Sequence, residues 1–203
     1  AVVSGNAKVF GDARVADTAM VFGNAVVSDS AVVSGNAKVF GKAKVSGNAW
    51  VSNSAAVSDS AVVSDNAMVF GDARVADTAM VSNSAKVFGN AKVSGNAKVS
   101  GNAWVFGKAR VSSEVMVSGE VKVSGDAAVH EPSDIALVKG FGSEFRTTSF
   151  FHCADGRVRC RCGCFYGTVD DFRVKVSETH GDSKYAKEYL MIADLMELHF
   201  KED

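Results

Sequence analysis

The sequence predicts a mainly β protein: a parallel β-helix of short repeats over residues 1–131, followed by a small α+β domain over residues 132–203. Two observations lead to this fold class. A six-residue pattern, as in Gly-Asn-Ala-Lys-Val-Phe at 5–10, runs without insertion from residue 1 to residue 131. The pattern stops at Pro132, and proline has no backbone N–H to donate to a neighbouring strand. The segment that follows differs in composition and contains all four cysteines.

Each repeat unit explains why the chain should coil. Valine occupies position 3 and every sixth residue through Val129, and alanine stands two residues earlier in every unit except at Val115 and Val121. Residues two apart in a strand share one face. The next two residues, drawn mostly from Gly, Asn, Asp, Ser and Thr, tolerate the positive φ of a corner. Ala and Val never recur at the helical period, so the repeat does not predict a helix. Twenty-two units of short strand and corner in succession predict a solenoid instead.

The repeat resembles that of the bacterial hexapeptide-repeat family, whose units follow an aliphatic-x-x-x-small-x pattern. Val3 and Val9 stand at the aliphatic positions, and Ala7 and Ala13 at the small ones. The resemblance implies a left-handed parallel β-helix of triangular section with three hexapeptides per coil. About seven coils at about 4.8 Å each make a rod about 35 Å long. The hand comes from the resemblance, since parallel crossovers in general are right-handed.

Composition limits the classes of function. A net charge of −1 excludes a strongly basic or acidic protein, and the near balance of charge in residues 1–131 argues against nucleic acid as a partner. No stretch approaches eighteen apolar residues, so no membrane span is expected. The four cysteines lie within 153–164, which favours a reducing compartment, and the expected location is the cytoplasm.

The N-terminal end of the repeat carries no stop signal. The chain begins in mid-repeat without a methionine, so we expect a trimmed or processed N-terminus. The first coil, Ala1–Thr18, has no proline and no change of pattern. We therefore expect that upstream residues or a second copy cover its unpaired edge.

Stacking by eighteen residues assigns the outward side chains to three faces, and one face gathers six large apolar side chains over four coils. They are Trp50, Met68, Phe70, Phe88, Trp104 and Phe106. A contiguous patch of this size is usually covered by something. We interpret it as an interface with a second subunit or with the C-terminal domain, and aromatic ladders that only stiffen the sheet are the alternative.

Another face stacks Arg74, Lys92 and Arg110 one coil apart, with Lys108 at the adjoining corner. Like charges about 5 Å apart repel one another. Side chains splayed into solvent are one interpretation. A bound anion or an acidic partner is the other, which makes these four residues candidates for an anion site.

The segment after Pro132 predicts a β-hairpin, one further strand and two helices. Asp155-Gly156 is a two-residue turn signal. The expected strands are Ile135–Val138, Phe145–Cys153 and Val158–Phe165.

Capping residues set the expected helix bounds. Thr168, with Asp171 three residues later, matches a capping box and opens a helix through about Thr179 that Gly181 ends. Asp182 is then expected to cap a longer helix that runs to about Lys201.

The segment after Pro132 contains the short motifs Gly163-Cys164-Phe165, Gly167-Thr168, Thr179-His180-Gly181-Asp182 and Lys187-Glu188-Tyr189. In these motifs it resembles a small domain on hexapeptide-repeat proteins of bacteria and their phages. The resemblance implies a bacterial or phage lineage and no chemistry.

The cysteines are expected to pack. Cys160, Cys162 and Cys164 alternate along the predicted strand, so their thiols share one face, and a two-residue turn would place Cys153 on the same face. Zinc sites usually use Cys-x-x-Cys, whereas Cys-x-Cys on a strand fits small buried hydrophobic residues. A zinc or redox role, and a catalytic cysteine paired with His152, are the alternatives.

The repeat region offers few candidate catalytic residues. Many hexapeptide-repeat proteins are acyltransferases with a histidine base, and others resemble γ-class carbonic anhydrases, which bind zinc through histidines on neighbouring coils. Residues 1–129 contain no histidine and no loop excursion. We therefore expect no catalytic site, no metal and no cofactor.

The predicted function is that of a non-catalytic structural or binding protein. Its solenoid would be a rigid rod that forms a homo-oligomer, a trimer or dimer, or presents the aromatic face to a protein partner. The alternative is an acyl- or sugar-nucleotide transferase of the hexapeptide-repeat type, with its ligand between solenoids.

Overall fold

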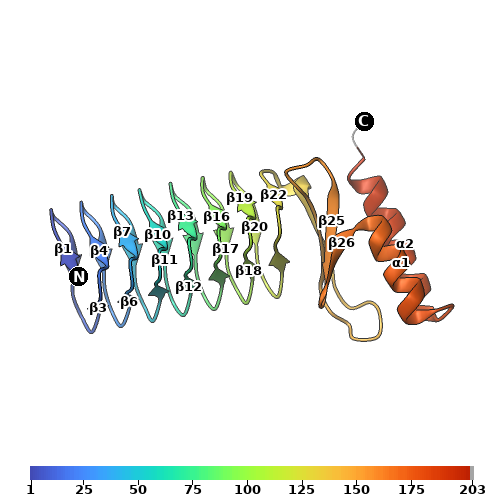
Figure 1. The fold of residues 1–203 in the computed structure, drawn as a ribbon, viewed down its shortest axis with the longest axis horizontal. Coiled ribbons are helices and arrows are strands. Elements are labelled where there is room, and N and C mark those ends of the chain that lie inside the picture. The colour runs from blue at the N-terminus through green and yellow to red at the C-terminus, as the bar shows by residue number, and fades with distance from the viewer. Residues whose placement is uncertain (202–203) are drawn as a thin grey trace.

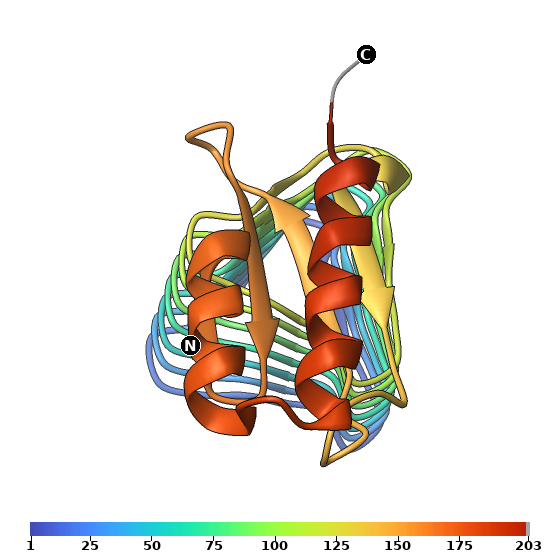
Figure 2. The ribbon, with the colours of Figure 1, turned by 90° about the vertical axis from the view of Figure 1, so that its right-hand side faces the viewer.

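The computed structural model describes residues 1–201 and consists of a rod of stacked coils, the solenoid (residues 1–131), with a cap (residues 132–201) at its C-terminal end (Figure 1). The view along the rod shows the layers of the cap: a sheet lies against the last coil, and two helices lie side by side outside the sheet (Figure 2). The N-terminus therefore lies at the end of the rod that is remote from the helices.

The solenoid consists of twenty-two strands of two residues each, and each strand from the first to the nineteenth pairs in parallel with the strand three places further on. Three strands thus make one coil of eighteen residues, and seven full coils plus one strand form three flat sheets. The prediction of a parallel solenoid of about seven coils is confirmed.

The three sheets are called sheet A, sheet B and sheet C. Sheet A contains β1 (Val2–Val3), β4 (Met20–Val21), β7 (Lys38–Val39), β10 (Ala56–Val57), β13 (Arg74–Val75), β16 (Lys92–Val93), β19 (Arg110–Val111) and β22 (Ala128–Val129). Sheet B contains β2 (Lys8–Val9), β5 (Val26–Val27), β8 (Lys44–Val45), β11 (Val62–Val63), β14 (Met80–Val81), β17 (Lys98–Val99) and β20 (Met116–Val117). Sheet C contains β3 (Arg14–Val15), β6 (Val32–Val33), β9 (Trp50–Val51), β12 (Met68–Val69), β15 (Lys86–Val87), β18 (Trp104–Val105) and β21 (Lys122–Val123).

Alanine and valine fill the interior of the solenoid. From Ala19 to Val117 every residue at these two repeat positions is 0% exposed. In the first coil the same positions stay partly accessible, and Val3 is 48% exposed, because no coil lies below it. The inward direction predicted for the repeated Ala and Val is therefore confirmed.

The corners explain why glycine and aspartate recur in the repeat. Every corner from Gly5 to Gly125 has its first residue at positive φ, which glycine and aspartate tolerate better than most residues. A Cβ on Gly41 would lie 2.8 Å from the backbone nitrogen of Asp59 in the next coil. The aspartates also link coils: the Asp77 carboxylate accepts a hydrogen bond from the Gly95 N–H at 2.8 Å. Turn preference alone does not predict this second role.

The cap sheet has four strands, one more than the three that the sequence predicted. Gly163-Cys164 forms a two-residue turn, with Gly163 at φ 58, and divides the predicted strand 158–165 into two. Phe145 has φ 49 and lies outside any strand, so the strand that was predicted to begin at Phe145 begins at Thr148 instead. After the 3-10 turn η1 (Pro132–Asp134), four antiparallel strands follow in order: β23 (Ile135–Val138), β24 (Thr148–His152), β25 (Val158–Cys162) and β26 (Phe165–Thr168).

The turn between β24 and β25 corrects the predicted face of Cys153. Cys153 donates its N–H to the Arg157 carbonyl at 2.9 Å, so the loop has three residues, 154–156, and not two. A shift of one residue in register moves side chains to the other face. Cys153 therefore packs on the solenoid core, whereas Cys160 lies in the core between sheet and helices.

The two helices cover the outer face of the cap sheet. Helix α1 (Val169–His180) starts from the predicted capping box of Thr168 and Asp171 and ends before Gly181. Helix α2 (Lys184–His199) is capped by Ser183, whose hydroxyl accepts from Ala186, so the predicted cap at Asp182 is wrong by one residue. Within residues 1–201 neither helix combines the length and hydropathy that crossing a membrane requires.

Candidate binding faces and the solenoid–cap junction

The structure brings the six residues of the predicted interface onto sheet C and the corner that follows it. Trp50 and Met68 are paired neighbours on β9 and β12, and Trp50 is 49% exposed. Lys86 separates Met68 from Trp104 in the same column. We call this surface the aromatic face; it consists of Trp50, Met68, Phe70, Phe88, Trp104 and Phe106.

The three phenylalanines of the aromatic face form a ladder. The rings of Phe70 and Phe88, and of Phe88 and Phe106, stack with centroids 4.9 Å apart and planes within 2°. Trp104 meets Phe88 edge-on with a centroid distance of 6.0 Å. All four rings nevertheless keep part of their surface accessible. The ladder alternative and the interface alternative therefore do not exclude each other.

Cations border the C-terminal part of the aromatic face. The Nζ atoms of Lys86 and Lys122 lie 5.1 and 4.9 Å from the ring centroid of Trp104. Arg161 of the cap places its guanidinium 5.0 Å from the Phe106 ring and donates from Nε to Ser124 at 2.7 Å. Exposed cation–π contacts contribute about 0.5–1 kcal/mol each. Within residues 1–201 the cap thus places a cation on the last rung of the ladder, and its residues Arg146 and Thr147 line a hollow together with Trp104.

The predicted anion-site residues lie on sheet A. Arg74, Lys92 and Arg110 are paired neighbours on β13, β16 and β19, whereas Lys108 lies at the corner before β19. Among residues 1–201 none of the four forms an ion pair. At about 5 Å in water two like charges repel by about 0.8 kcal/mol. The column therefore carries positive charge that the solenoid does not neutralise by contact.

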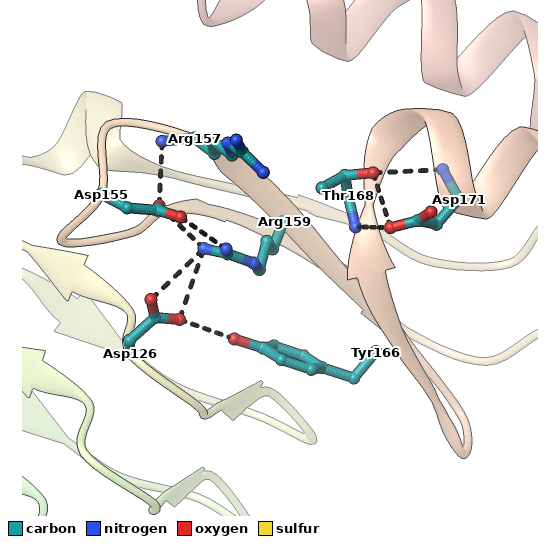
Figure 3. Close-up of polar contacts among 7 residues, drawn as sticks. All are labelled: Asp126, Asp155, Arg157, Arg159, Tyr166, Thr168 and Asp171. Atoms are coloured by element: carbon teal, nitrogen blue, oxygen red, sulfur yellow. Dashed lines mark hydrogen bonds and ion pairs between the residues drawn. The ribbon is translucent and has the colours of Figure 1, made fainter.

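Arg159 of β25 ties the cap to the last coil (Figure 3). Its guanidinium donates to both carboxylate oxygens of Asp155 at 2.8 and 2.6 Å and lies 3.4 Å from both oxygens of Asp126. The Tyr166 hydroxyl donates to Asp126 at 3.0 Å. The hydrogen bonds from Arg159 lower the pKa of Asp155 to about 2. This cluster joins residues of the solenoid, β26 and the β24–β25 hairpin.

Backbone contacts complete the junction. Ala127 and Cys153 form an antiparallel bridge, and the Ala154 N–H donates to the Asp126 carbonyl at 3.0 Å. The Ser149 hydroxyl donates to the Lys122 carbonyl at 2.9 Å. Strand β24 and its hairpin therefore take up backbone groups of the last coil that would otherwise form an open edge.

One cluster at the junction contains side chains of the kinds that bind metal ions, but its charges and pKa values favour a structural role in holding the cap on the solenoid. Ligand atoms of Asp126, Cys153 and Asp155 lie within 4.8 Å of one another. Arg159 already supplies a positive charge to both carboxylates. Burial raises the pKa of the Cys153 thiol and so disfavours the thiolate that binds metals. We assign this cluster to cap docking.

Two histidines line a hollow of about 410 Å³ between sheet A and the cap. His130 Nδ1 lies 2.7 Å from the Ser112 hydroxyl, and His152 Nδ1 lies 3.2 Å from Asp134. Burial opposes ionisation of Asp134, but hydrogen bonds from the His130 and Glu131 N–H groups and from His152 leave its pKa lowered. Cys153 lies just after the end of β24 and also lines this hollow, but its side chain packs on the solenoid core.

The remaining thiols have three different environments. Cys160 is fully buried, and this burial raises its pKa. The Cys162 thiol lies 3.8 Å from the Tyr189 hydroxyl. Cys164 is exposed at the turn after β25. The expectation that all of Cys160, Cys162 and Cys164 share one face is therefore wrong for Cys164.

Two features escaped the sequence-based prediction. Phe22 and Phe40 form a second stacked pair beside sheet A, with centroids 5.0 Å apart, and their spacing of one coil could have revealed it. The junction of Asp126 with Arg159 and Tyr166 left no such signal, because docking of the cap decides which of these residues meet.

Comparison with known proteins supports the solenoid repeat. A family model described as the YdcK β-solenoid repeat matches residues 19–35, a stretch just short of one coil. No curated protein and no solved structure matches the chain.

Proposed function

We propose that this protein is a non-catalytic rigid scaffold whose aromatic face joins copies of the chain into a homo-oligomer, a dimer or trimer. The observation that carries the proposal is the accessibility of that face: every aromatic ring on it keeps part of its surface exposed, and within residues 1–201 a cation of the cap contacts Phe106 alone. Interface cores are enriched in aromatic residues and methionine. A different protein partner on the same face is the second form of the proposal.

The regularity of the rod supports the role of a scaffold. Each coil contacts its neighbours in unbroken register, and corner aspartates such as Asp77 link one coil to the next. In a solenoid the length follows directly from the number of repeats. Such a rod holds a surface at a fixed distance from the cap.

The proposal includes no catalytic step and places the protein in the cytoplasm. The four thiols are free, which suits a reducing compartment. A bacterial or phage lineage rests on the resemblance of the repeat and of the cap. Calorimetric titration with an acyl-CoA and with a sugar nucleotide tests the non-catalytic part, since specific heat of binding would favour a transferase.

Light scattering tests the assembly. We expect the wild-type chain to be a dimer or trimer at micromolar concentration. Trp104→Asp places a charge in a desolvated contact and should weaken the assembly by at least about tenfold. Met116→Asp is the matched control, because Met116 is also an outward residue, on sheet B, and is 69% exposed.

Three outcomes contradict this assignment. The wild-type chain is a monomer at high micromolar concentration, or Met116→Asp dissociates the assembly as strongly as Trp104→Asp. The third outcome concerns α2, whose outer side exposes Met191, Leu195 and Leu198. If Leu195→Asp dissociates the assembly and Trp104→Asp does not, the contact runs through the helices.

A further inference from the structure

Sheet A differs from the other two sheets in its outward side chains. Each solenoid strand begins with an outward residue, and in sheets B and C this residue is always Val, Met, Trp, Lys or Arg. Alanine occupies the position only at Ala56 and Ala128, and both lie in sheet A. Between them stand Arg74, Lys92 and Arg110. The small side chains of Ala56 and Ala128 therefore leave a gap in the outward column on each side of three adjacent cations.

The gap at Ala56 is a hollow of about 520 Å³, within the size range of small-molecule sites. Lys38 lies one coil below Ala56 and Arg74 one coil above, so each end of the hollow carries a cation. Phe40 lines one side and is held in place by its stack on Phe22. Asn36 and Ser54 line the hollow with an amide and a hydroxyl.

The carboxylates at the corners after β10 and β13 form no ion pair with these cations within residues 1–201. The Asp59 carboxylate accepts from the Ser58 hydroxyl at 2.7 Å, and the Asp77 carboxylate accepts from the Gly95 N–H at 2.8 Å. Across the described residues 1–201, neither Lys38 nor Arg74 has a carboxylate within 4.0 Å. The hollow thus combines an aromatic wall, polar groups and two cations without ion-pair partners.

The gap at Ala128 extends the same line to the cap. Its hollow is lined by Arg110 on the near side and by His130 and His152 at the cap, together with the Asp134 carboxylate, which lies 3.2 Å from His152 Nδ1. From Lys38 to Ala128 the column spans five coils, or about 24 Å. A ligand that uses both hollows must therefore be long and narrow and must carry repeated negative charge.

We propose that sheet A binds a linear acidic polysaccharide. One sugar ring lies in the hollow at Ala56 against Phe40, with its hydroxyls toward Asn36 and Ser54. Its carboxylate pairs with Lys38 or Arg74, and the chain continues past Lys92 toward the hollow at Ala128.

Other polymers fit this face less well. Single-stranded nucleic acid needs a succession of stacking platforms, and the path from Arg74 to Arg110 offers cations with no aromatic ring between them. A protein partner needs an apolar centre that binding can desolvate; the aromatic face of sheet C offers one, whereas the stretch of sheet A from Arg74 to Arg110 carries three adjacent cations. Assembly through sheet C leaves sheet A open, so this proposal does not depend on the proposed oligomer.

Filling the hollow without changing charge tests its role. The probe is polygalacturonate, titrated by calorimetry into the full chain at low salt. Ala56→Met should weaken binding by at least about tenfold. It should not disturb the fold, because methionine is already the outward residue at Met20, Met68, Met80 and Met116. Val62→Met, at the same position of the next strand on sheet B, should bind as the wild type does.

A second pair of variants separates local charge from net charge. Arg74→Gln should weaken binding and reduce its salt dependence, since it removes a cation at the end of the hollow. Lys44→Gln removes the same charge from sheet B, where Lys44 has valine on both neighbouring coils, and should have little effect.

Four results overturn the proposal. Polygalacturonate fails to bind the wild-type chain, or Ala56→Met binds it unchanged. Lys44→Gln weakens binding as much as Arg74→Gln, which would show a general charge effect. A single-stranded oligonucleotide or polyglutamate binds more tightly than polygalacturonate, which would assign the face to another class of polymer.

Discussion

At the scale of the residue, neighbours on one strand meet opposite environments. On β11, Val62 points outward and is partly accessible, whereas Val63 is 0% exposed in the interior. The residue type is the same, so any difference between equal substitutions must come from position. The interior offers only apolar side chains of Val and Ala to a new polar group.

This contrast gives the first prediction. Val63→Asp buries a carboxylate without a partner and should lower the free energy of unfolding by at least about 3 kcal/mol. Val62→Asp places its charge in solvent beside Lys44 and should change it by less than about 1 kcal/mol. Urea unfolding followed by circular dichroism measures both. Similar losses for the two variants would contradict the inward assignment of the repeated valine.

At the scale of the element, the β24–β25 hairpin decides how the cap meets the rod. Its three-residue loop turns Cys153 toward the solenoid and places Asp155 beside Arg159. Gly156 has φ 76 and so supplies the positive φ that a loop of this length requires. The charge on Asp155 then holds Arg159 near Asp126 of the last coil.

Low pH should weaken the docking of the β24–β25 hairpin on the last coil. Arg159 depresses the pKa of Asp155 to about 2, below the value of about 3.9 for an unfolded chain. The native state therefore gains stability above about pH 4, and loses this gain as the pH falls toward about 2. Hydrogen exchange at the Ala154 N–H, which is bonded to Asp126, should quicken over this range relative to its intrinsic rate.

Asp155→Asn provides the comparison for the acid effect. The variant keeps an oxygen acceptor for Arg159 but has no charge to titrate, so the protection of Ala154 should depend less on pH. Asp182→Asn controls for the change in net charge, since Asp182 lies outside the hairpin. An identical pH dependence in the wild type and in Asp155→Asn would remove Asp155 as the cause.

At the scale of the whole molecule, the number of residues between two side chains decides whether they share a face. Strands three apart pair, so a spacing of eighteen residues keeps a face and a spacing of six rotates to the next one. The interior does not distinguish the two cases, because every unit supplies the same Ala and Val positions. Function and stability therefore respond differently to deletions.

Two deletions test this separation. Removing residues 89–94 keeps the repeat in phase but moves Trp104 and Phe106 from sheet C to sheet B, so the chain should fold and should fail to assemble. Removing residues 17–34, one whole coil, shortens the rod by about 4.8 Å and leaves the aromatic face intact, so assembly should persist. Circular dichroism and light scattering measure the two effects. Assembly of the first variant would contradict a contact through the aromatic face.

The solenoid follows from the repeat alone, because the residue types within every unit specify which side chains point inward and where the chain turns. The resemblance to the hexapeptide-repeat family implied a coil of eighteen residues, and this spacing was then enough to predict the aromatic face and the column of Arg74, Lys92 and Arg110. Capping residues also set the bounds of α1 correctly. These features depend on contacts between residues within one unit or one coil apart.

The arrangement of the cap and its docking on the solenoid depend on contacts between elements far apart in the sequence. The face of Cys153 depends on one residue of loop length, which neither Asp155-Gly156 nor the strand pattern determines. Arg159 and Asp126 are 33 residues apart in the sequence. They meet because the cap sheet packs with one face on the solenoid core and with the other face on the core under the helices. Such a contact is specified by the packing of whole elements, and no local pattern encodes it.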